Sequence, residues 1–223
     1  MSSKFSNSKK KTRILVVDDH PIVRQGFAQL INSEEDLEMV AEAGDFSEAM
    51  DALRQHQPDF AIVDVSLKGG NGIDLTKAML AESPKLPILI ISMHDEGLYV
   101  ERVLRAGARG YLMKQEATEQ VIGAIRKILK GELYVSDRMG EALIQKFVSG
   151  QPSTDSPLEN FSDRELEVMQ LVGQGRGTRQ IAEELHVSVK TIESHYAKIK
   201  EKLNLKTANE LIQYAVKWFH SDT

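Results

Sequence analysis

Cysteine is absent from the 223 residues of this chain, which excludes disulfide bridges, thiolate metal sites and a cysteine nucleophile. The 15 glycines and 6 prolines are too few for a collagen-like or low-complexity chain. Apolar runs such as Ile88–Ile91 are far shorter than the roughly 20 residues of a membrane helix. The N-terminal segment is polar and lacks the apolar core of a signal peptide. These absences predict a soluble, cytoplasmic protein with no membrane partner.

Charge is unevenly distributed along the chain. The formal net charge is −5, yet residues 12–131 alone carry 13 basic and 19 acidic side chains. Residues 188–206, by contrast, contain five lysines and two glutamates. A basic segment attached to an acidic body is compatible with a surface for nucleic acid. On charge alone a solvated helix face is the simpler interpretation, so the assignment needs further support.

The first half of the sequence alternates short apolar runs with amphipathic stretches. Continuous Val, Ile and Leu runs that alternate with helical patterns are typical of parallel strands covered by helices on both faces. Five such units predict an α/β domain over residues 12–131, a doubly wound, flavodoxin-like, five-stranded parallel sheet. The predicted strands are Ile14–Val17, Met39–Ala41, Phe60–Val63, Ile88–Ile91 and Tyr111–Met113. The predicted helices lie near 21–32, 46–56, 71–82, 96–106 and 118–130.

The second half is predicted to be a linker followed by a small all-α domain. The linker covers residues 132–157, with a helix at 137–148 and a Pro-, Gly- and Ser-rich end. No strand pattern follows, and four short helices are expected within residues 158–223. The first and fourth begin with a capping box, a hydroxyl residue followed three positions later by glutamate, at Ser162 and Thr207. The second covers Thr178–Leu185, and the third is capped by Ser188 and runs through Leu203.

Reactive side chains stand at the ends of the predicted strands. The first strand is followed by Asp18 and Asp19, the third by Asp64 and the fourth by Ser92, and the fifth leads to Lys114. Because the carboxyl ends of parallel strands share one edge of the sheet, these groups are expected to converge where such sheets bind ligands.

The converging groups suit phosphoryl chemistry. Three carboxylates repel one another unless a cation joins them, and Mg²⁺ is a hard ion that prefers such ligands. A carboxylate can also act as a nucleophile and form an acyl phosphate. Lys114 and Ser92 could then bind the phosphoryl oxygens. Taken singly, an aspartate at a strand end more often caps a helix and a lone lysine is usually solvated, so the assignment rests on the complete set.

Residues 13–130 resemble the receiver domain of bacterial two-component response regulators. The matching stretches are Ile14-Leu-Val-Val-Asp-Asp-His-Pro21, Ala61-Ile-Val-Asp-Val-Ser66, Ile90-Ile-Ser-Met-His-Asp95 and Gly110-Tyr-Leu-Met-Lys114. The resemblance implies that Asp64 accepts a phosphoryl group from a cognate histidine kinase. It also implies that Mg²⁺ is held by Asp18, Asp19, Asp64 and the backbone carbonyl of Ser66, and that Ser92 and Tyr111 form a switch pair.

The third helix of the C-terminal domain has two distinct faces. At about 100° per residue, its apolar side chains fall in one arc, which predicts a buried stripe. The outward side is narrow, basic and hydroxylated, which suits the major groove of DNA. An amphipathic surface helix is the alternative, and the preceding helix and tight turn favour DNA. The buried stripe comprises Val189, Ile192, Tyr196, Ile199 and Leu203, and the outward side is centred on Lys190, Ser194, Ala197 and Glu201.

This segment resembles the LuxR-type helix-turn-helix. The matching stretches are Phe161-Ser-Asp-Arg-Glu-Leu-Glu-Val168, Ile181-Ala-Glu-Glu-Leu185, Val189-Lys-Thr-Ile-Glu-Ser-His195 and Lys202-Leu203. With the receiver, the chain resembles a NarL/FixJ-type response regulator over nearly its whole length. The resemblance places base reading at Glu193, Ser194 and Ala197, with Lys190 beside them. The full set of expected DNA contacts is Lys190, Thr191, Glu193, Ser194, His195, Ala197, Lys198 and Lys202.

The leading hypothesis is therefore a phosphorylation-switched, DNA-binding transcription regulator rather than an enzyme. Because one short recognition helix reads few base pairs, a homodimer on double-stranded DNA is expected, with Trp218 or Val216 in the contact. One alternative is a regulator whose helical tail binds protein or RNA. Another is a Mg²⁺-dependent phosphohydrolase, although Asp64-Val-Ser offers no second carboxylate two residues on to act as general acid.

Overall fold

The computed structural model describes residues 10–68, 70–93, 96–149 and 160–221. The chain folds into two compact units, Met1–Gly140 and Glu141–Thr223. The predicted linker end at 150–157 lies outside the described residues. No helix within the described part of the chain combines the length and the apolar character that a membrane crossing requires.

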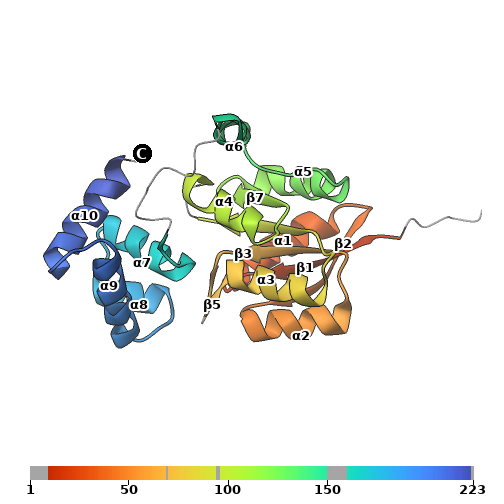
Figure 1. Ribbon diagram of the computed structural model, residues 1–223. Helices are drawn as coiled ribbons and strands as arrows, with labels where there is room; N and C mark the ends of the chain where they lie inside the picture. Colours follow the sequence, from red (N-terminus) through yellow and green to blue (C-terminus); the bar gives the residue numbers. More distant parts are fainter. Residues whose placement is uncertain (1–9, 69, 94–95, 150–159, 222–223) are drawn as a thin grey trace, which may run out of the picture. The chain divides into compact units, whose positions relative to one another are not determined.

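The first unit is built around a parallel sheet of five strands in the order β2-β1-β3-β6-β7. Four of these strands, β1, β2, β3 and β7, are labelled in Figure 1. Every neighbouring pair in this sheet is parallel, because a helix connects each strand to the next. The predicted flavodoxin-like fold is confirmed. The strands are β1 (Thr12–Val17), β2 (Leu37–Ala43), β3 (Phe60–Asp64), β6 (Ile88–Ser92) and β7 (Gly110–Met113).

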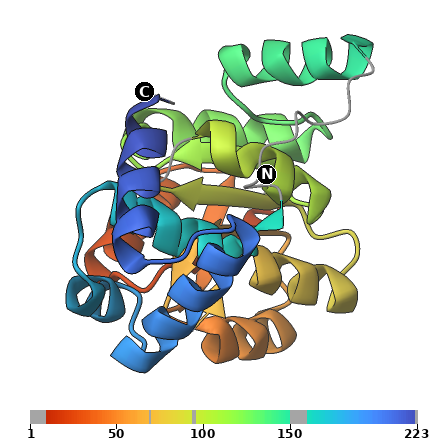
Figure 2. The same cartoon turned by 60° about the vertical axis from the view of Figure 1, so that its left-hand side comes forward.

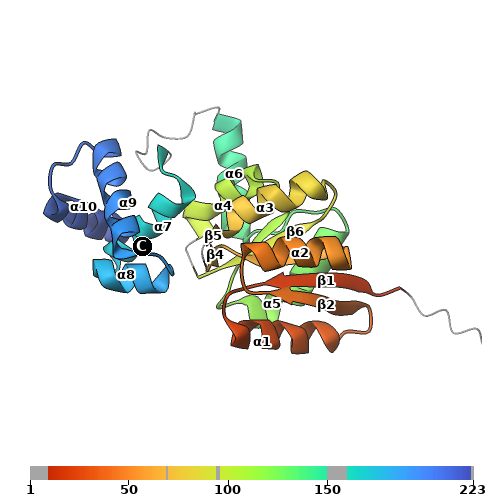
Figure 3. The same ribbon diagram turned by 90° about the horizontal axis from the view of Figure 1, so that it is seen from below.

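Helices cover both faces of this sheet. Viewed from below, α1 and α5 lie on one side and α2 and α3 on the other (Figure 3). The central strands are buried on both faces, which explains their unbroken apolar runs. On the α1 and α5 side, the core includes Phe27, Ile31, Val121 and Ile125. The helices are α1 (Pro21–Asn32), α2 (Phe46–His56), α3 (Gly72–Glu82), α4 (Glu96–Arg105) and α5 (Ala117–Leu129).

A small hairpin between β3 and α3 was not predicted. It consists of β4 (Ser66–Leu67) and β5 (Gly70–Asn71), which pair antiparallel. Two-residue strands carry no periodicity, so the sequence pattern cannot reveal them. The hairpin matters because it shapes the backbone just after Asp64.

The linker helix forms as predicted. It is α6 (Asp137–Ser149), which begins within the first compact unit and continues into the second. Several of its apolar side chains are exposed, among them Ile144 and Val148.

The C-terminal domain contains four helices, coloured from teal to dark blue in Figure 2. The Ser162 capping box is present, with the Ser162 hydroxyl accepting from the Glu165 amide and the Glu165 carboxylate accepting from the Ser162 amide. Gly173 ends the first helix, where a Cβ would lie 2.7 Å from Phe219 Cβ and 2.8 Å from the Ala215 carbonyl oxygen. Glycine at this position therefore permits close packing of the first helix on the last. The four helices are α7 (Asp163–Gly173), α8 (Thr178–Glu184), α9 (Val189–Lys202) and α10 (Ala208–Ser221).

Candidate functional site

The acidic groups at the strand ends form one pocket. Asp18 and Asp19 follow β1, and Asp64 ends β3, which lies beside β1 in the sheet. Asp18 and Asp64 are almost completely buried, and Asp19 keeps 9% of its side chain exposed. The convergence expected from a parallel sheet is therefore present in the structure. Buried carboxylates need a positive partner, because removing their charge from water is costly.

Lys114 supplies that partner from the end of β7. Its Nζ lies 2.6 Å from Asp64 Oδ2 and 2.7 Å from Asp18 Oδ2, and only 11% of its side chain is exposed. The Lys114 amide also donates to the Ser92 carbonyl at 2.8 Å, which fixes the start of the loop after β7. One ammonium thus bridges two carboxylates that are separated by 46 positions in the sequence.

Burial and charge shift the pKa values in this pocket. Burial raises the pKa of Asp64 to about 8; the Lys114 ammonium opposes this change and the Asp18 carboxylate adds to it. Burial alone would lower the pKa of Lys114, but the carboxylates of Asp64 and Asp18 raise it overall. The Lys114 ammonium alone therefore does not offset the burial of Asp64, and a further cation would favour the ionised form of Asp64.

The donor groups suit a divalent cation. Oxygen atoms of Asp18, Asp19 and Asp64 and a ring nitrogen of His20 all lie within 4.8 Å of one another. Hard carboxylate oxygens are the ligands that Mg²⁺ prefers. Sequence reasoning missed His20, whose Nδ1 lies 2.7 Å from Asp19 Oδ1 and 3.2 Å from Asp18 Oδ1. Its position directly after the two aspartates was the available signal.

The proposed switch residues lie beside the pocket on neighbouring strands. Ser92 ends β6 and is fully buried, and Tyr111 on β7 is 1% exposed. In the parallel register, Tyr111 pairs with Ile90, two residues before Ser92. A change at Asp64 can therefore reach both residues through adjacent strands.

The backbone after Asp64 is held closely by Gly72. The Gly72 amide donates to the Val65 carbonyl at 2.7 Å, and a Cβ at Gly72 would lie 1.9 Å from the Asp64 carbonyl oxygen. Only glycine fits this position. The Ser66 amide lies 3.4 Å from Asp64 Oδ1, which is a long hydrogen bond at best.

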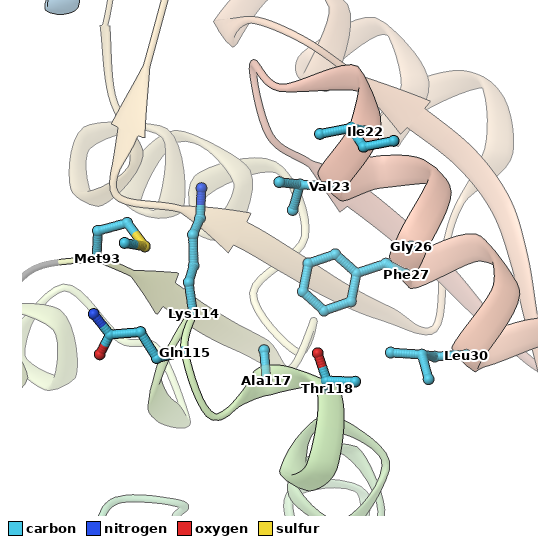
Figure 4. A pocket seen from close by; sticks show the side chains of 10 residues that line it. All are labelled: Ile22, Val23, Gly26, Phe27, Leu30, Met93, Lys114, Gln115, Ala117 and Thr118. Atoms are coloured by element: carbon cyan, nitrogen blue, oxygen red, sulfur yellow. The ribbon is translucent and has the colours of Figure 1, made fainter.

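An apolar groove opens next to Lys114, with a volume of about 430 Å³ (Figure 4). One wall comes from α1 and the other from the start of α5. Ile22, on the α1 wall, is 74% exposed, and Met93, near Lys114 in Figure 4, is 59% exposed. Large apolar side chains exposed beside a reactive pocket are typical of a contact surface.

The outward face of α9 presents the residue types that DNA binding requires. The predicted buried positions Ile192 and Ile199 are both fully buried, so the orientation of the helix agrees with the angular analysis. Ser188 caps the helix, with its hydroxyl accepting from the Thr191 amide at 3.1 Å. The exposed members of the predicted set are Lys190, Glu193, Ser194, Ala197, Lys198 and Lys202.

One detail of the α9 prediction is wrong, and two of the predicted DNA contacts are partly buried. Val189, assigned to the buried stripe, is 39% exposed. Thr191 is partly buried, and its hydroxyl lies 2.8 Å from that of Ser188, so it belongs to the cap network. His195 is partly buried and its Nδ1 is buried; burial first and then Arg164 lower the pKa of its ring. These features favour packing roles for Thr191 and His195.

Lys202, predicted to contact DNA phosphate, is exposed and also has partners within the domain. Its Nζ lies 2.6 Å from Oε2 of the buried Glu165 and 2.8 Å from the Asn160 carbonyl oxygen. It also lies 5.9 Å from the centre of the Phe161 ring. The ammonium therefore neutralises a buried carboxylate on α7, and loss of Lys202 would leave that carboxylate without its cation.

We expect Lys202→Met to destabilise the C-terminal domain by about 1–2 kcal/mol, because it leaves Glu165 buried without its cation. The cost stays below that of a fully buried pair because Lys202 keeps 34% of its side chain in water. Trp218, the only tryptophan, lies on α10, so its fluorescence in a urea titration reports this domain. Lys198→Met, at an exposed position, is the control and should change the free energy of unfolding by less than about 0.5 kcal/mol.

The pH dependence of the same variant gives a second check. Burial opposes ionisation of Glu165, but hydrogen bonds from Lys202 and Ser162 outweigh it and lower its pKa below the ordinary value of 4.5. The ionised pair therefore stabilises the domain fully above pH 4.5, and this stabilisation disappears as the pH falls through the lowered pKa. Equal stabilities of wild type and variant at pH 7 would show that the pair contributes nothing.

Two families match this chain. Residues 14–126 match the response regulator receiver domain, and residues 159–215 match the bacterial regulatory proteins of the luxR family. The first match contains the acidic pocket, and the second contains α9.

Similar proteins span the whole architecture. The oxygen regulatory protein NreC of Staphylococcus carnosus is 42% identical over 210 residues, which cover 92% of this chain and 97% of that protein. A structure of RcsB from Salmonella enterica serovar Typhimurium, bound to promoter P1flhDC in the presence of phosphomimetic BeF3-, is 27% identical with a TM-score of 0.60. It covers 92% of this chain and 98% of its own. A LuxR-family response regulator from Aurantimonas sp. SI85-9A1 is 34% identical with a TM-score of 0.58, over 62% of this chain and 99% of its own.

Proposed function

The chain belongs to the response regulators that join a receiver domain to a LuxR-type helix-turn-helix domain, and we propose that phosphorylation of Asp64 switches its binding to DNA. It is a DNA-binding regulator of transcription in a two-component system. The observation that supports the switch most strongly is the buried Asp64 carboxylate, with Lys114 at 2.6 Å and two further aspartates beside it. We assign the receiver to residues 12–131 and the DNA-binding domain to residues 158–223.

Asp64 would act as the nucleophile. One of its oxygens attacks phosphorus, an acyl phosphate bond forms, and the bond between phosphorus and the donor nitrogen of a phosphohistidine breaks. Lys114, already in contact with Asp64, would then pair with the phosphoryl oxygens. Ser92 and Tyr111 would respond to the new group and shift the receiver between conformations.

The carboxylates of Asp18, Asp19 and Asp64, with the backbone carbonyl of Ser66, would hold Mg²⁺. The ion, when bound, neutralises charge on the phosphoryl oxygens. The oxygen donors and their mutual distances, within 4.8 Å for the side chains, support this assignment. The His20 ring contacts two of these carboxylates, those of Asp18 and Asp19.

The phosphoryl donor would be a cognate histidine kinase. A protein that delivers a phosphoryl group to Asp64 must lie against the edge of the sheet at which Lys114 stands. The apolar groove formed by α1 and α5 adjoins Lys114 and exposes Ile22, so it offers the contact area that such a partner needs. We assign this groove to the kinase.

On the DNA side, Lys190 and Lys198 would contact phosphates, while Glu193, Ser194 and Ala197 would face base edges. All five are exposed on α9. Base reading depends on the identity of these side chains, so substitution of Ser194 is expected to change sequence preference rather than salt dependence. Binding to chromosomal DNA also implies that the protein works in the cytoplasm.

Gel shifts with double-stranded DNA and with RNA test the function directly. Fragments selected from a random DNA pool by the wild-type protein should be bound far more tightly than structured or single-stranded RNA of equal length. Preferential binding to RNA would favour the alternative of an RNA-interaction regulator. Multiple turnover of a phosphomonoester would support the phosphohydrolase alternative.

Two copies are expected on one DNA site. On α10, Leu211 and Ala215 are fully buried, and Val216 and Trp218 are partly buried, while Ile212 keeps 45% of its surface exposed. Ile212 is therefore a better candidate for the two-fold contact than Val216 or Trp218. Sedimentation of the phosphorylated protein on DNA with two half-sites should show two copies for wild type and weaker pairing for Ile212→Glu. A single copy at saturation on every half-site spacing would exclude the dimer.

A further inference from the structure

The segment that leaves α5 is attached to the edge of the sheet. Residues 133–136, here called the strap, follow α5 and precede α6. The Tyr111 amide donates to the Tyr134 carbonyl at 2.8 Å, and the Tyr134 amide donates to the Arg109 carbonyl at 3.0 Å. Gly110 permits this approach, because a Cβ there would lie 2.8 Å from the Tyr134 carbonyl oxygen. The strap is thus bonded directly to the backbone of Tyr111, one of the two proposed switch residues.

The Tyr134 side chain fixes the strap to α5. Its hydroxyl donates to Gln120 Oε1 at 2.7 Å, and the Lys127 ammonium lies 5.8 Å from the centre of its ring. These contacts hold the middle of the strap on the receiver. Its end, at Ser136, is held by a different element.

Both carboxylate oxygens of Glu96 accept a hydrogen bond from Ser136. Oε1 accepts from the Ser136 amide at 2.8 Å, and Oε2 accepts from the Ser136 hydroxyl. Glu96 is the first residue of α4, where a carboxylate is favoured by the helix dipole. Ser136 stands just before α6: its hydroxyl accepts from the Met139 amide at 3.2 Å and its carbonyl accepts from the Gly140 amide at 2.9 Å. One carboxylate therefore joins the starts of two helices, and we call this contact the clasp.

The clasp is near one switch residue in sequence and is linked to the other through the strap. Glu96 follows Ser92 by four positions, and Tyr134, two positions before Ser136, is bonded to the Tyr111 backbone. The helix that the clasp holds, α6, begins in the first compact unit and continues into the second. Since a hydrogen bond is lost when its atoms separate by about 1 Å, a small movement of the first turn of α4 would break the clasp.

We propose that the Glu96–Ser136 clasp transmits the phosphorylation state of the receiver to α6, and through it to DNA binding. The inference rests on the proposed switch at Asp64. Phosphorylation moves Ser92 and Tyr111, the first turn of α4 and the strap move with them, and the start of α6 changes its hydrogen bonding. A clasp with different stability in the two receiver states couples the acyl phosphate to the linker. A clasp that is equally stable in both receiver states would transmit nothing to α6.

The test compares the affinity for selected double-stranded DNA before and after treatment of the full chain with acetyl phosphate and Mg²⁺. For wild type, phosphorylation should change the dissociation constant by about tenfold or more. Glu96→Ala should reduce this ratio, of the dissociation constants before and after phosphorylation, by about fivefold or more. The variant should still carry the wild-type amount of acid-labile phosphate. Glu141→Ala removes an exposed carboxylate from α6 and is the matched control, which should keep the wild-type ratio.

Ser136→Ala removes the hydroxyl contact but keeps the backbone amide that donates to Glu96, so it should reduce the ratio less than Glu96→Ala does. The double variant should show the same ratio as Glu96→Ala, because that change already removes both hydrogen bonds. Amide hydrogen exchange at Met139 and Gly140 should change on phosphorylation in wild type and not in Glu96→Ala. If Glu96→Ala fails to fold, Glu96→Gln, which retains one acceptor oxygen, should show an intermediate ratio. If folded, phosphorylated Glu96 variants keep the wild-type ratio of dissociation constants, the role of the clasp is overturned and the switch at Asp64 is not. Absence of a response in phosphorylated wild type would overturn the proposed switch itself.

Discussion

Asp64→Asn is expected to abolish phosphorylation of this protein by acetyl phosphate in the presence of Mg²⁺. The amide that replaces the carboxylate is a poor nucleophile, so the yield of acid-labile phosphate should fall by about two orders of magnitude or more. Asp64 is 2% exposed and within 2.6 Å of Lys114, the position expected of a group that reacts inside a preformed pocket. The measurement is the amount of acid-labile label that the protein takes up from radiolabelled acetyl phosphate, with acid-stable label as the control.

Asp51→Asn is the matched control for this substitution. Asp51 lies on α2 with 73% of its side chain exposed, so the same chemical change there should leave labelling at the wild-type level. Asp19→Ala should instead raise the Mg²⁺ concentration needed for half-maximal labelling. Labelling of Asp64→Asn at the wild-type rate would show that another residue is the acceptor.

The second large effect is expected on α9. The double substitution Lys190→Glu and Lys198→Glu should weaken binding to selected DNA by about 100-fold or more at moderate salt, because two attractive phosphate contacts become repulsive. Both lysines are exposed, so the domain should fold normally. The single variant Lys198→Ala should weaken binding to all sequences and lower the salt slope by about one.

The control for the double substitution has the same net charge. Lys217→Glu with Lys130→Glu reverses two exposed lysines on α10 and at the end of α5. If affinity depends on the α9 face rather than on total charge, this control should bind within about threefold of wild type. An equal loss in both double variants would show that the outward face of α9 is not the DNA surface.

The pocket was predictable because topology alone determines it. Parallel strands connected by helices must place their carboxyl ends on one edge, so Asp18, Asp64 and Lys114 meet although they are far apart in sequence. The helix boundaries were also accurate where caps or glycines mark them, as at Ser162.

The features that escaped prediction depend on single tertiary contacts. The sequence does not distinguish Gly72 from other loop glycines, because its close contact with the Asp64 carbonyl exists only in the folded structure. The strap at Tyr134 pairs with Tyr111 through backbone groups, which leave no mark on side-chain periodicity. His20 directly follows the two aspartates, but only the structure shows that its ring contacts their carboxylates.

The ion pair of Lys202 was not predicted for the same reason. Helical angle correctly placed Lys202 on the flank of α9, and a lysine there is by default a phosphate contact. Its partner Glu165 lies 37 positions earlier, on α7, so only the packing of the two helices shows that the ammonium is already paired. Charge counts along a sequence therefore overestimate the basic surface that is available to DNA.

The central claim, that Asp64 controls DNA binding, is tested most directly by one titration. Fluorescently labelled DNA, selected by the wild-type protein, is titrated with the full chain in the presence and absence of acetyl phosphate and Mg²⁺. We expect phosphorylation to change the dissociation constant of wild type by about tenfold or more and to leave that of Asp64→Asn unchanged. An equal response to acetyl phosphate in wild type and Asp64→Asn, or no response in fully phosphorylated wild type, would contradict this account.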